Sequence, residues 1–385
     1  MCCSLRGWIN VGVIACVGLV LPSVAGAAVQ APGFSGGPEV VNDGLLWAGS
    51  SSGRESVFLS TATAGTDLLV PDAELSAVHV DDGWVVVADQ SGPMVGRMGR
   101  PLRVVRALRR CPPIQANAEG DRLEAVADDD LYAVVRASCF GRRPGDAELL
   151  VRVRLGTGDL LVIGEVSSGA ISLAAAGSRL ALTYEVGVEV LDSHDGRRIY
   201  RFSAPSGTRG NPNRETQLDA KGDILVTGFR PRPLPGWGEA VGWWGSPKTP
   251  IAHPLESGFE PPVVGGRLAY ASLSDGRIAY ATGDEGQTRL KVLNIATGEA
   301  RTVVTFSGAV SMEGFGLGGT LLAWAQQKYA FTTKREGPPL LSCVTEAPVG
   351  SPELTETTLS PAGPPVVVNI SPGPRPAGVG CPPPP

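Results

Sequence analysis

The chain has 385 residues and a formal net charge of −5, which is only mildly acidic and gives no basic field for binding nucleic acid. Its 51 Gly and 33 Pro favour a fold with many turns. About 355 residues remain after the targeting segment described next, enough for two ordinary domains or one large β architecture.

The first 27 residues have the features of a secretory signal peptide. Arg6 supplies the positive charge, an apolar run extends from Trp8 to Leu21, and Ala25-Gly26-Ala27 supplies small residues at the cleavage site. No later stretch is long and uncharged enough to span a membrane. We therefore expect residues 1–27 to be removed and the mature chain to be secreted or extracytoplasmic, without a transmembrane segment.

A second interpretation of this segment is a lipoprotein signal. Val13-Ile14-Ala15-Cys16 resembles a lipobox, whose Cys is lipidated and becomes the new N-terminus. However, the apolar sequence continues past Cys16 to Leu21, where a lipoprotein normally becomes polar. A lipid anchor at Cys16 is therefore the minor alternative.

A turn followed by a short apolar strand recurs seven times along the chain. The mean spacing is about 46 residues, and the blades of β-propellers repeat at about 40 to 50 residues. The seven turns are Asn42-Asp43-Gly44, Asp81-Asp82-Gly83, Asp128-Asp129-Asp130, Ala176-Gly177-Ser178, Lys221-Gly222-Asp223, Asp275-Gly276 and Gly318-Gly319.

A second, Gly-containing turn follows inside each unit. Such turns join antiparallel strands, so two turns per unit predict four strands, A to D, with turns at A–B and C–D. The clear examples are Gly156-Thr157-Gly158-Asp159, Ser193-His194-Asp195-Gly196 and Ala296-Thr297-Gly298-Glu299, and weaker ones lie at Ala64-Gly65, Gly99-Arg100-Pro101, Gly245-Ser246 and Gly337-Pro338.

These units predict an all-β fold with a single β-propeller of seven four-stranded blades over residues 28–345, because a ring of such sheets leaves few exposed edges. A β-sandwich is the alternative, but it would not need a steady period over seven units. Gly266 to Tyr270 are read as strand A of the sixth blade, and other counts give six or eight blades. Residues 346–385 are rich in Pro and predict an extended tail, with Val366 to Ile370 as one added strand.

Short pieces of the repeat resemble known propeller families. Val188-Glu189-Val190-Leu191-Asp192-Ser193-His194-Asp195-Gly196-Arg197 is similar to a repeat of the pyrroloquinoline-quinone-type propellers, and Leu290 to Glu299 is similar too. The wider pattern resembles the TolB-like and WD40-like propellers of bacterial secreted proteins. The Trp that closes quinoprotein repeats and the WD dipeptide are missing, so the resemblance implies the fold and carries over no cofactor or substrate.

Four Cys follow the signal peptide: Cys111, Cys139, Cys343 and Cys381. In an oxidising compartment they predict two disulfides, for which three pairings exist. In a four-stranded blade the B–C loops share one face with the D–A connections between blades. Cys111 falls in a D–A connection and Cys139 just after strand B of the same blade, which favours Cys111–Cys139 and leaves Cys343–Cys381 to hold the tail.

Arginines gather in loops of that same face. Arg offers a planar fork suited to carboxylate, phosphate or sulfate groups, and Trp offers a stacking surface. The competing interpretation is that these are solvated loop charges in an Arg-rich protein. The predicted ligand-binding residues are Arg109, Arg110, Arg142, Arg143, Arg230, Arg232 and Trp237, with Arg54 in a loop of the same face.

The candidate catalytic motifs lack the neighbouring structure or the spacing that their chemistry requires. Gly49-Ser50-Ser51-Ser52-Gly53 has the spelling of a nucleophile elbow, but a second strand follows it where the elbow needs a helix. His79, His194 and His253 are scattered, and Asp128-Asp129-Asp130 lacks the oxygen spacing of a calcium loop. We therefore predict no catalytic residues, no metal site and no cofactor.

Two functions from different classes fit this pattern. The first is an exported, non-catalytic binding or scaffold protein that recognises a protein or an anionic small molecule or polysaccharide through the loops of one face. The alternative is an extracellular propeller enzyme of polysaccharide lyase or hydrolase type, with its site at the central channel. A cluster of His, Tyr and carboxylates at the channel would favour the enzyme. We expect binding, by a monomer, with no nucleic-acid partner.

Overall fold

The structure is a computed structural model in which Met1–Ala31 and Pro32–Pro385 form separate units. The signal peptide, Cys16, Cys343 and Cys381 lie outside the described residues, and the predictions on them stay predictions. The described residues are 33–41, 44–51, 54–61, 65–73, 78–81, 83–88, 92–98, 100–114, 123–141, 147–205, 214–231, 238–255, 258–259, 271–284, 287–307, 310–318, 321–330, 347–348, 353–358 and 366–370.

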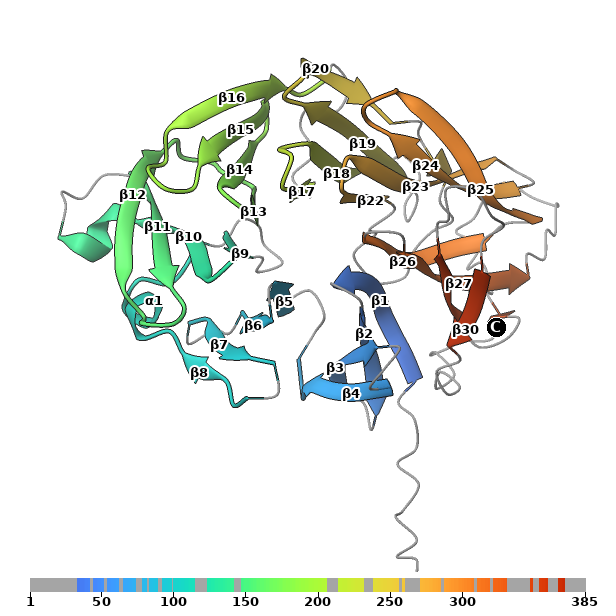
Figure 1. Cartoon of the computed structure of the whole chain (residues 1–385), viewed down its shortest axis with the longest axis horizontal. Coiled ribbons are helices and arrows are strands. Elements are labelled where there is room, and N and C mark those ends of the chain that lie inside the picture. The colour runs from blue at the N-terminus through green and yellow to red at the C-terminus, as the bar shows by residue number, and fades with distance from the viewer. Residues whose placement is uncertain are drawn as a thin grey trace, which may run out of the picture. The chain divides into compact units, whose positions relative to one another are not determined.

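The described strands of the second unit form antiparallel sheets in chain order (Figure 1). Six sheets take four strands each from β1 to β25, and a seventh combines β26, β27, β29 and β30. The first three contain β1 (Gly33–Val41), β2 (Gly44–Ser51), β3 (Arg54–Thr61), β4 (Gly65–Val70), β5 (Val78–Asp81), β6 (Trp84–Val87), β7 (Met94–Arg97), β8 (Arg103–Val104), β9 (Glu124–Ala127), β10 (Asp130–Arg136), β11 (Glu148–Arg154) and β12 (Leu160–Val166).

The remaining sheets continue the same order. The fourth to sixth contain β13 (Ser172–Ala176), β14 (Arg179–Tyr184), β15 (Gly187–Asp192), β16 (Arg198–Ser203), β17 (Arg214–Leu218), β18 (Ile224–Pro231), β19 (Gly238–Ser246), β20 (Thr249–Pro254), β22 (Ala271–Ser274), β23 (Arg277–Asp284), β24 (Gln287–Asn294) and β25 (Glu299–Ser307). The last contains β26 (Val310–Gly318), β27 (Leu321–Ala330), β29 (Glu353–Thr358) and β30 (Val366–Ile370), while β21 (Gly258–Phe259) pairs with β19 and β28 (Ala347–Pro348) with β27.

The sheets are the blades of a β-propeller, which confirms the predicted fold class. The first strand of each sheet lies nearest the centre (Figure 1), and these inner strands contact one another in succession from β5 through β9, β13, β17 and β22 to β26. The ring closes where β1 contacts β26 and β27. Hydrophobic side chains fill the space between neighbouring blades, for example Val57 of the first against Val85 of the second, and Trp243 of the fifth against Phe202 of the fourth.

The seven predicted A–B turns all fall between the first and second strands of a blade. Two-residue connections of this kind need positive φ, which Gly adopts without strain. Gly83 and Gly276 have φ of 74° and 72° at such turns. In the Gly49–Gly53 segment, residues 49–51 are the end of β2 and pair with β3, so a strand follows where a nucleophile elbow needs a helix.

Two parts of the predicted strand assignment differ from the structure. Strand A of the sixth blade is β22 at Ala271–Ser274, directly before its turn, whereas the predicted Gly266 to Tyr270 lie outside the described residues. The last blade takes its two outer strands from the segment predicted as a tail. Val366 to Ile370 form a strand as predicted, but β29 at Glu353–Thr358 was not predicted.

Polar and small side chains of the inner strands set the distance between blades. Gln217 of β17 accepts a hydrogen bond from the Leu273 amide and donates one to the Ala271 carbonyl, both in β22. Ser272 of β22 accepts one from the Leu317 amide in β26. At Gly316 of β26, the backbone of β1 comes so close that no side chain fits.

Outer strands of the blades carry β-bulges. The pairing of strands C and D shifts register in the first, third, fourth, fifth and sixth blades. A bulge twists an edge strand and leaves one residue unpaired, which hinders the addition of a further strand. The rim of the ring is therefore poorly suited to edge-to-edge association.

Replacing Gly316 by Ala tests ring closure. The new methyl group would collide with the Val40 backbone nitrogen, so β26 and β1 must separate, and we expect a loss of about 1–3 kcal/mol in the free energy of unfolding. The control is Gly156→Ala in the β11–β12 turn, where nothing lies within 4 Å of the added atom. Urea unfolding measures both variants, and equal stability of the two would contradict this account of the closure.

Candidate functional site

A short helix lies in the connection between the second and third blades, on the face that carries the B–C loops. Helix α1 (Arg106–Arg110) follows β8 and precedes β9. Leu108 is fully buried in the core between these blades. The Val105 amide donates to the Pro93 carbonyl at 2.8 Å, and Gly92 lies so near Arg109 that an added Cβ would be 3.2 Å from its Cα. The helix is thus held firmly against the B–C loop of the second blade.

The exposed side of α1 is basic. Arg106, Arg109 and Arg110 are exposed, and none of their side chains has a hydrogen bond or ion pair within the described part of the chain. Arg109 and Arg110 occupy the last turn, where a positive charge interacts favourably with the helix dipole. Arg106 occupies the first turn, where the dipole is unfavourable, and like charges three and four residues apart repel. Helix stability therefore does not explain this set of charges.

The other predicted ligand-binding residues are distributed differently. Arg230 lies at the end of β18, opposite Glu239 of β19. Arg54 forms an ion pair of 3.2 Å with Asp72, with side chains 77% and 58% exposed, so it is less available to a ligand. Four residues lie outside the described part of the chain: Arg142, Arg143, Arg232 and Trp237.

The structure brings Cys111 and Cys139 together. Cys111 directly follows α1, and Cys139 lies in the 3₁₀ helix η2 (Ala137–Phe140) after β10. Both are free thiols, and the two side chains lie within hydrogen-bonding reach of each other. Both residues therefore lie on the α1-bearing face, while the predicted disulfide is not formed in this structure.

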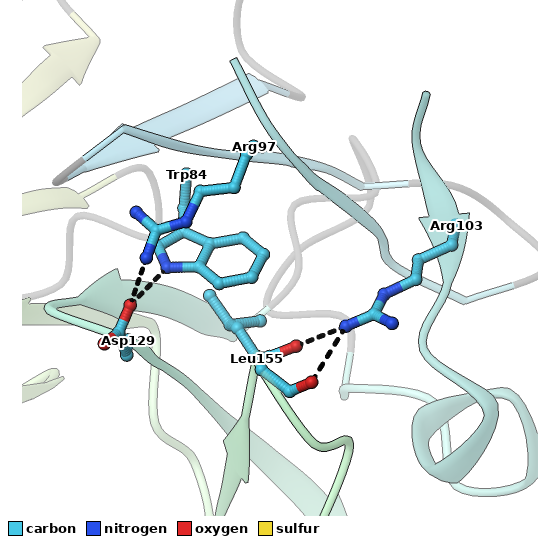
Figure 2. A network of polar contacts seen from close by, with 6 residues as sticks. Trp84, Arg97, Arg103, Asp129 and Leu155 are labelled. Carbon is cyan, nitrogen blue, oxygen red and sulfur yellow. Dashed lines mark hydrogen bonds and ion pairs between the residues drawn. The ribbon is translucent and has the colours of Figure 1, made fainter. Parts of the chain in front are cut away.

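On the opposite face, side chains of one blade hold the turns of the next. Figure 2 shows Trp84 and Arg97 of the second blade around Asp129, in the A–B turn of the third. The Trp84 indole Nε1 donates to Asp129 Oδ1 at 2.6 Å, and Arg97 Nη2 donates to the same oxygen at 2.7 Å. The Arg97 guanidinium also lies 4.2 Å from the centroid of the Trp84 ring. The three groups satisfy one another through charge-assisted hydrogen bonds and a cation–π contact.

Similar contacts recur between the following blades. Arg103 Nη2 donates to the Leu155 carbonyl of the third blade at 2.6 Å (Figure 2). From the fourth blade, Arg179 Nη1 donates to the Ala220 carbonyl of the fifth at 2.9 Å. From the fifth, Lys221 Nζ donates to the Asp275 carbonyl of the sixth at 2.7 Å. These basic side chains are engaged in holding the ring, in contrast to the arginines of α1.

A half-buried carboxyl group lies on the α1-bearing face between the third and fourth blades. Glu148 opens β11, and its Oε2 is buried without a hydrogen-bond partner among the described residues. Burial raises the pKa of Glu148, although a backbone hydrogen bond from Gly169 and the charge of Arg136 act in the opposite direction. Burial also raises the pKa of nearby Tyr184 to about 12, helped by the charges of Glu189 and Glu148.

Ionisable residues also occur on the inner strands, where an enzyme of this fold would act. Glu39, His79 and Glu124 lie on β1, β5 and β9, and each already takes part in an interaction. Glu215 on β17 is exposed. Within the described ranges, no group of three or more His, Cys, Asp and Glu is placed to hold a metal ion.

The remaining His residues have local surroundings that suit structural positions. His194 is exposed in the β15–β16 turn, where its amide donates to Asp192 Oδ1 at 2.8 Å and its Nδ1 lies 3.5 Å from Arg152 Nη1. His253 of β20 stacks on Trp244 with ring centroids 4.3 Å apart. Trp244 and its neighbour Trp243 face opposite sides of β19, and both are buried between blades.

Comparison with known proteins gives a likeness of fold. No protein-family model and no curated protein matches the sequence. Among solved structures, an oligogalacturonate lyase in complex with manganese is 12% identical, with a TM-score of 0.43 over 88% of this chain and 89% of that one. A prolyl endopeptidase is 11% identical, with a TM-score of 0.48 over 88% of this chain and 50% of that one.

A chain of the mitotic checkpoint complex is 12% identical, with a TM-score of 0.44 over 77% of this chain and 90% of that one. At such identities the likeness concerns the fold alone, and neither activity nor partner carries over. In the part of the chain that the structure describes, no helix has the length and apolar character needed to cross a membrane.

Replacing Asp129 by Ala tests the contact between the second and third blades. The change leaves the part-buried Trp84 indole without its acceptor and removes the Arg97 ion pair, so we expect a loss of about 1–2 kcal/mol in the free energy of unfolding. The control is Asp159→Ala, because among the described residues that side chain bonds to Thr157 of its own turn and to no other blade. Denaturant unfolding gives both values. A loss no larger than that of the control would disprove the bridging role.

Replacing Glu148 by Gln tests its buried charge. Because its pKa is raised in the folded state, Glu148 contributes stability that is full below its ordinary pKa of 4.5 and is lost as pH rises through the raised value. The Gln variant should therefore gain stability relative to the wild type between pH 4 and pH 7.5. Urea unfolding at several pH values measures this, with Glu165→Gln on β12, an exposed position, as the control. A constant difference at every pH would rule out a raised pKa.

Proposed function

We propose that this chain is an exported, non-catalytic binding or scaffold propeller that recognises an anionic partner through the face bearing α1. The supporting observation is the set of exposed guanidinium groups of Arg106, Arg109 and Arg110, which have no partner among the described residues, on a helix that is itself firmly held. Arginines on a rigid element lose little freedom on binding, and their planar forks match carboxylate, phosphate and sulfate groups.

Other basic residues of the propeller differ from the arginines of α1 in their contacts. Arg97, Arg103 and Arg179 bond to turns of a neighbouring blade, so each already has a structural role. By sequence, the site extends to Arg142 and Arg143, which follow η2 in the next loop. Of the further predicted residues, Arg230 lies at the end of β18 in the fifth blade, and Arg232 and Trp237 follow it in the sequence.

The partner class follows from this chemistry. A sulfated or carboxylated polysaccharide, or an acidic segment of a protein, offers repeated anionic groups to several arginines at once. The predicted signal peptide at residues 1–27 supports action outside the cytoplasm, and the repeat pattern supports a place near the TolB-like and WD40-like secreted propellers. The binding function is favoured over an enzyme at the channel because Glu39, His79 and Glu124 are already engaged in contacts.

Removing two arginines of α1 tests this function. Heparin and polyglutamate serve as sulfate and carboxylate probes in biolayer interferometry with the mature protein. We expect Arg109→Ala with Arg110→Ala to raise the Kd about tenfold, because two exposed ionic contacts contribute about 1.4 kcal/mol together. The difference should shrink at high salt, because salt screens exposed charges.

The matched control removes the same charge from the opposite face. Arg100→Ala with Arg197→Ala changes two exposed residues of C–D turns and should leave the Kd within about twofold, since less than about 0.4 kcal/mol is then lost. An equal loss in both double variants would mean that net charge alone governs binding. That result, or no binding of the wild type to either probe, would overturn the proposal.

A further inference from the structure

The two thiols beside α1 differ in their access to solvent. Cys111 is 6% exposed and belongs to the hydrophobic core between the second and third blades. Cys139 is exposed in η2, and its Sγ lies 4.0 Å from the Arg110 carbonyl oxygen. The two side chains meet across the D–A connection and the B–C loop of the third blade. A dissolved reagent can therefore reach one thiol of the pair and not the other.

Their surroundings also give the two thiols different reactivity. Burial and the neighbouring Cys139 raise the pKa of Cys111 to about 12, so Cys111 remains protonated at neutral pH. The thiolate is the nucleophile in exchange with disulfides, and access decides which thiol meets an external disulfide first. Cys139 is therefore the group that meets an external disulfide, and Cys111 is placed to react second.

We propose that Cys111 and Cys139 form an ordered thiol–disulfide exchange site, in which Cys139 attacks an external disulfide and Cys111 then resolves the mixed disulfide into a Cys111–Cys139 crosslink. In the first step the Cys139 thiolate bonds to one sulfur of the external disulfide, and the other sulfur leaves as a thiolate. In the second, the Cys111 thiol passes its proton to the thiolate released in the first step, its sulfur bonds to the Cys139 sulfur, and the second external sulfur leaves as a thiolate. The two cysteines are oxidised and one external disulfide is reduced to two thiols.

The crosslink has a structural consequence that is independent of any ligand. It ties the end of α1 to η2 and so closes a loop over β9 and β10, the two inner strands of the third blade. Crosslinking a chain restricts its unfolded state, which raises the stability of the fold. We expect the oxidised protein to unfold about 5 °C above the reduced protein.

Single substitutions distinguish the ordered mechanism from random oxidation. The full-length mature protein is incubated with oxidised glutathione, and peptide mapping after alkylation reads the state of each cysteine, so that other cysteines do not contribute. In the wild type we expect a linked Cys111–Cys139 peptide pair. In Cys111→Ser we expect a lasting glutathione adduct on Cys139. In Cys139→Ser we expect the glutathione adduct on Cys111 to form at least tenfold more slowly than the adduct on Cys139 forms in Cys111→Ser.

Thermal unfolding supplies the second readout. The wild type should show the rise in Tm on oxidation, whereas Cys111→Ser and Cys139→Ser should not. An adduct that forms on Cys111 of Cys139→Ser as fast as on Cys139 of Cys111→Ser would overturn the order of attack. Two free thiols in the wild type after prolonged incubation would overturn the site itself. Neither result depends on polyanion binding, so this inference and the proposed function can fail separately.

Discussion

Contacts from the side chains of one blade to the turns of the next hold this ring together. A blade is a small sheet that buries its faces only against its neighbours. Its position in the ring therefore depends on the contacts between neighbouring blades. The Trp84, Arg97 and Asp129 cluster joins the second and third blades, and Arg179 joins the fourth and fifth. These polar contacts fix turns whose backbone would otherwise be set only by hydrophobic packing, which has little directional preference. The arginines of α1 make no such contact with a described residue, which distinguishes them from these basic side chains.

Much of the fold could be predicted from the period of its turns. A tight turn is a local property of Asp, Asn and Gly, so Asp275-Gly276 signals its hairpin without knowledge of the rest of the chain. The last blade was predicted less well, because Glu353–Thr358 lies in a Pro-rich context and pairs with a strand more than twenty residues earlier. Helix α1 was missed because five residues show no helical period, and its stability comes from the burial of Leu108.

The candidate site could also be predicted only in part, because some of its features depend on the order of the strands and others on which residues lie nearby in space. Topology alone placed Cys111 and Cys139 on one face, and the structure has them in contact. Sequence could not separate Arg109, which has no ion pair with any described residue, from Arg54, which is paired with Asp72. That distinction depends on which acid lies nearby in space. The raised pKa of Glu148 could likewise not be predicted from the sequence, since the burial of a residue at the start of a strand depends on the neighbouring blade.

The closure of the ring bears on how the chain reaches its native state. Strand β1 at Gly33–Val41 contacts β26 at Val310–Gly318, so β1 finds this neighbour only after the long stretch of chain between them has been made. Contacts this distant in sequence slow folding, because the loop entropy must be lost before they form. Strand β1 therefore lacks this neighbour until β26 has been made, and closure of the ring is a late step of folding.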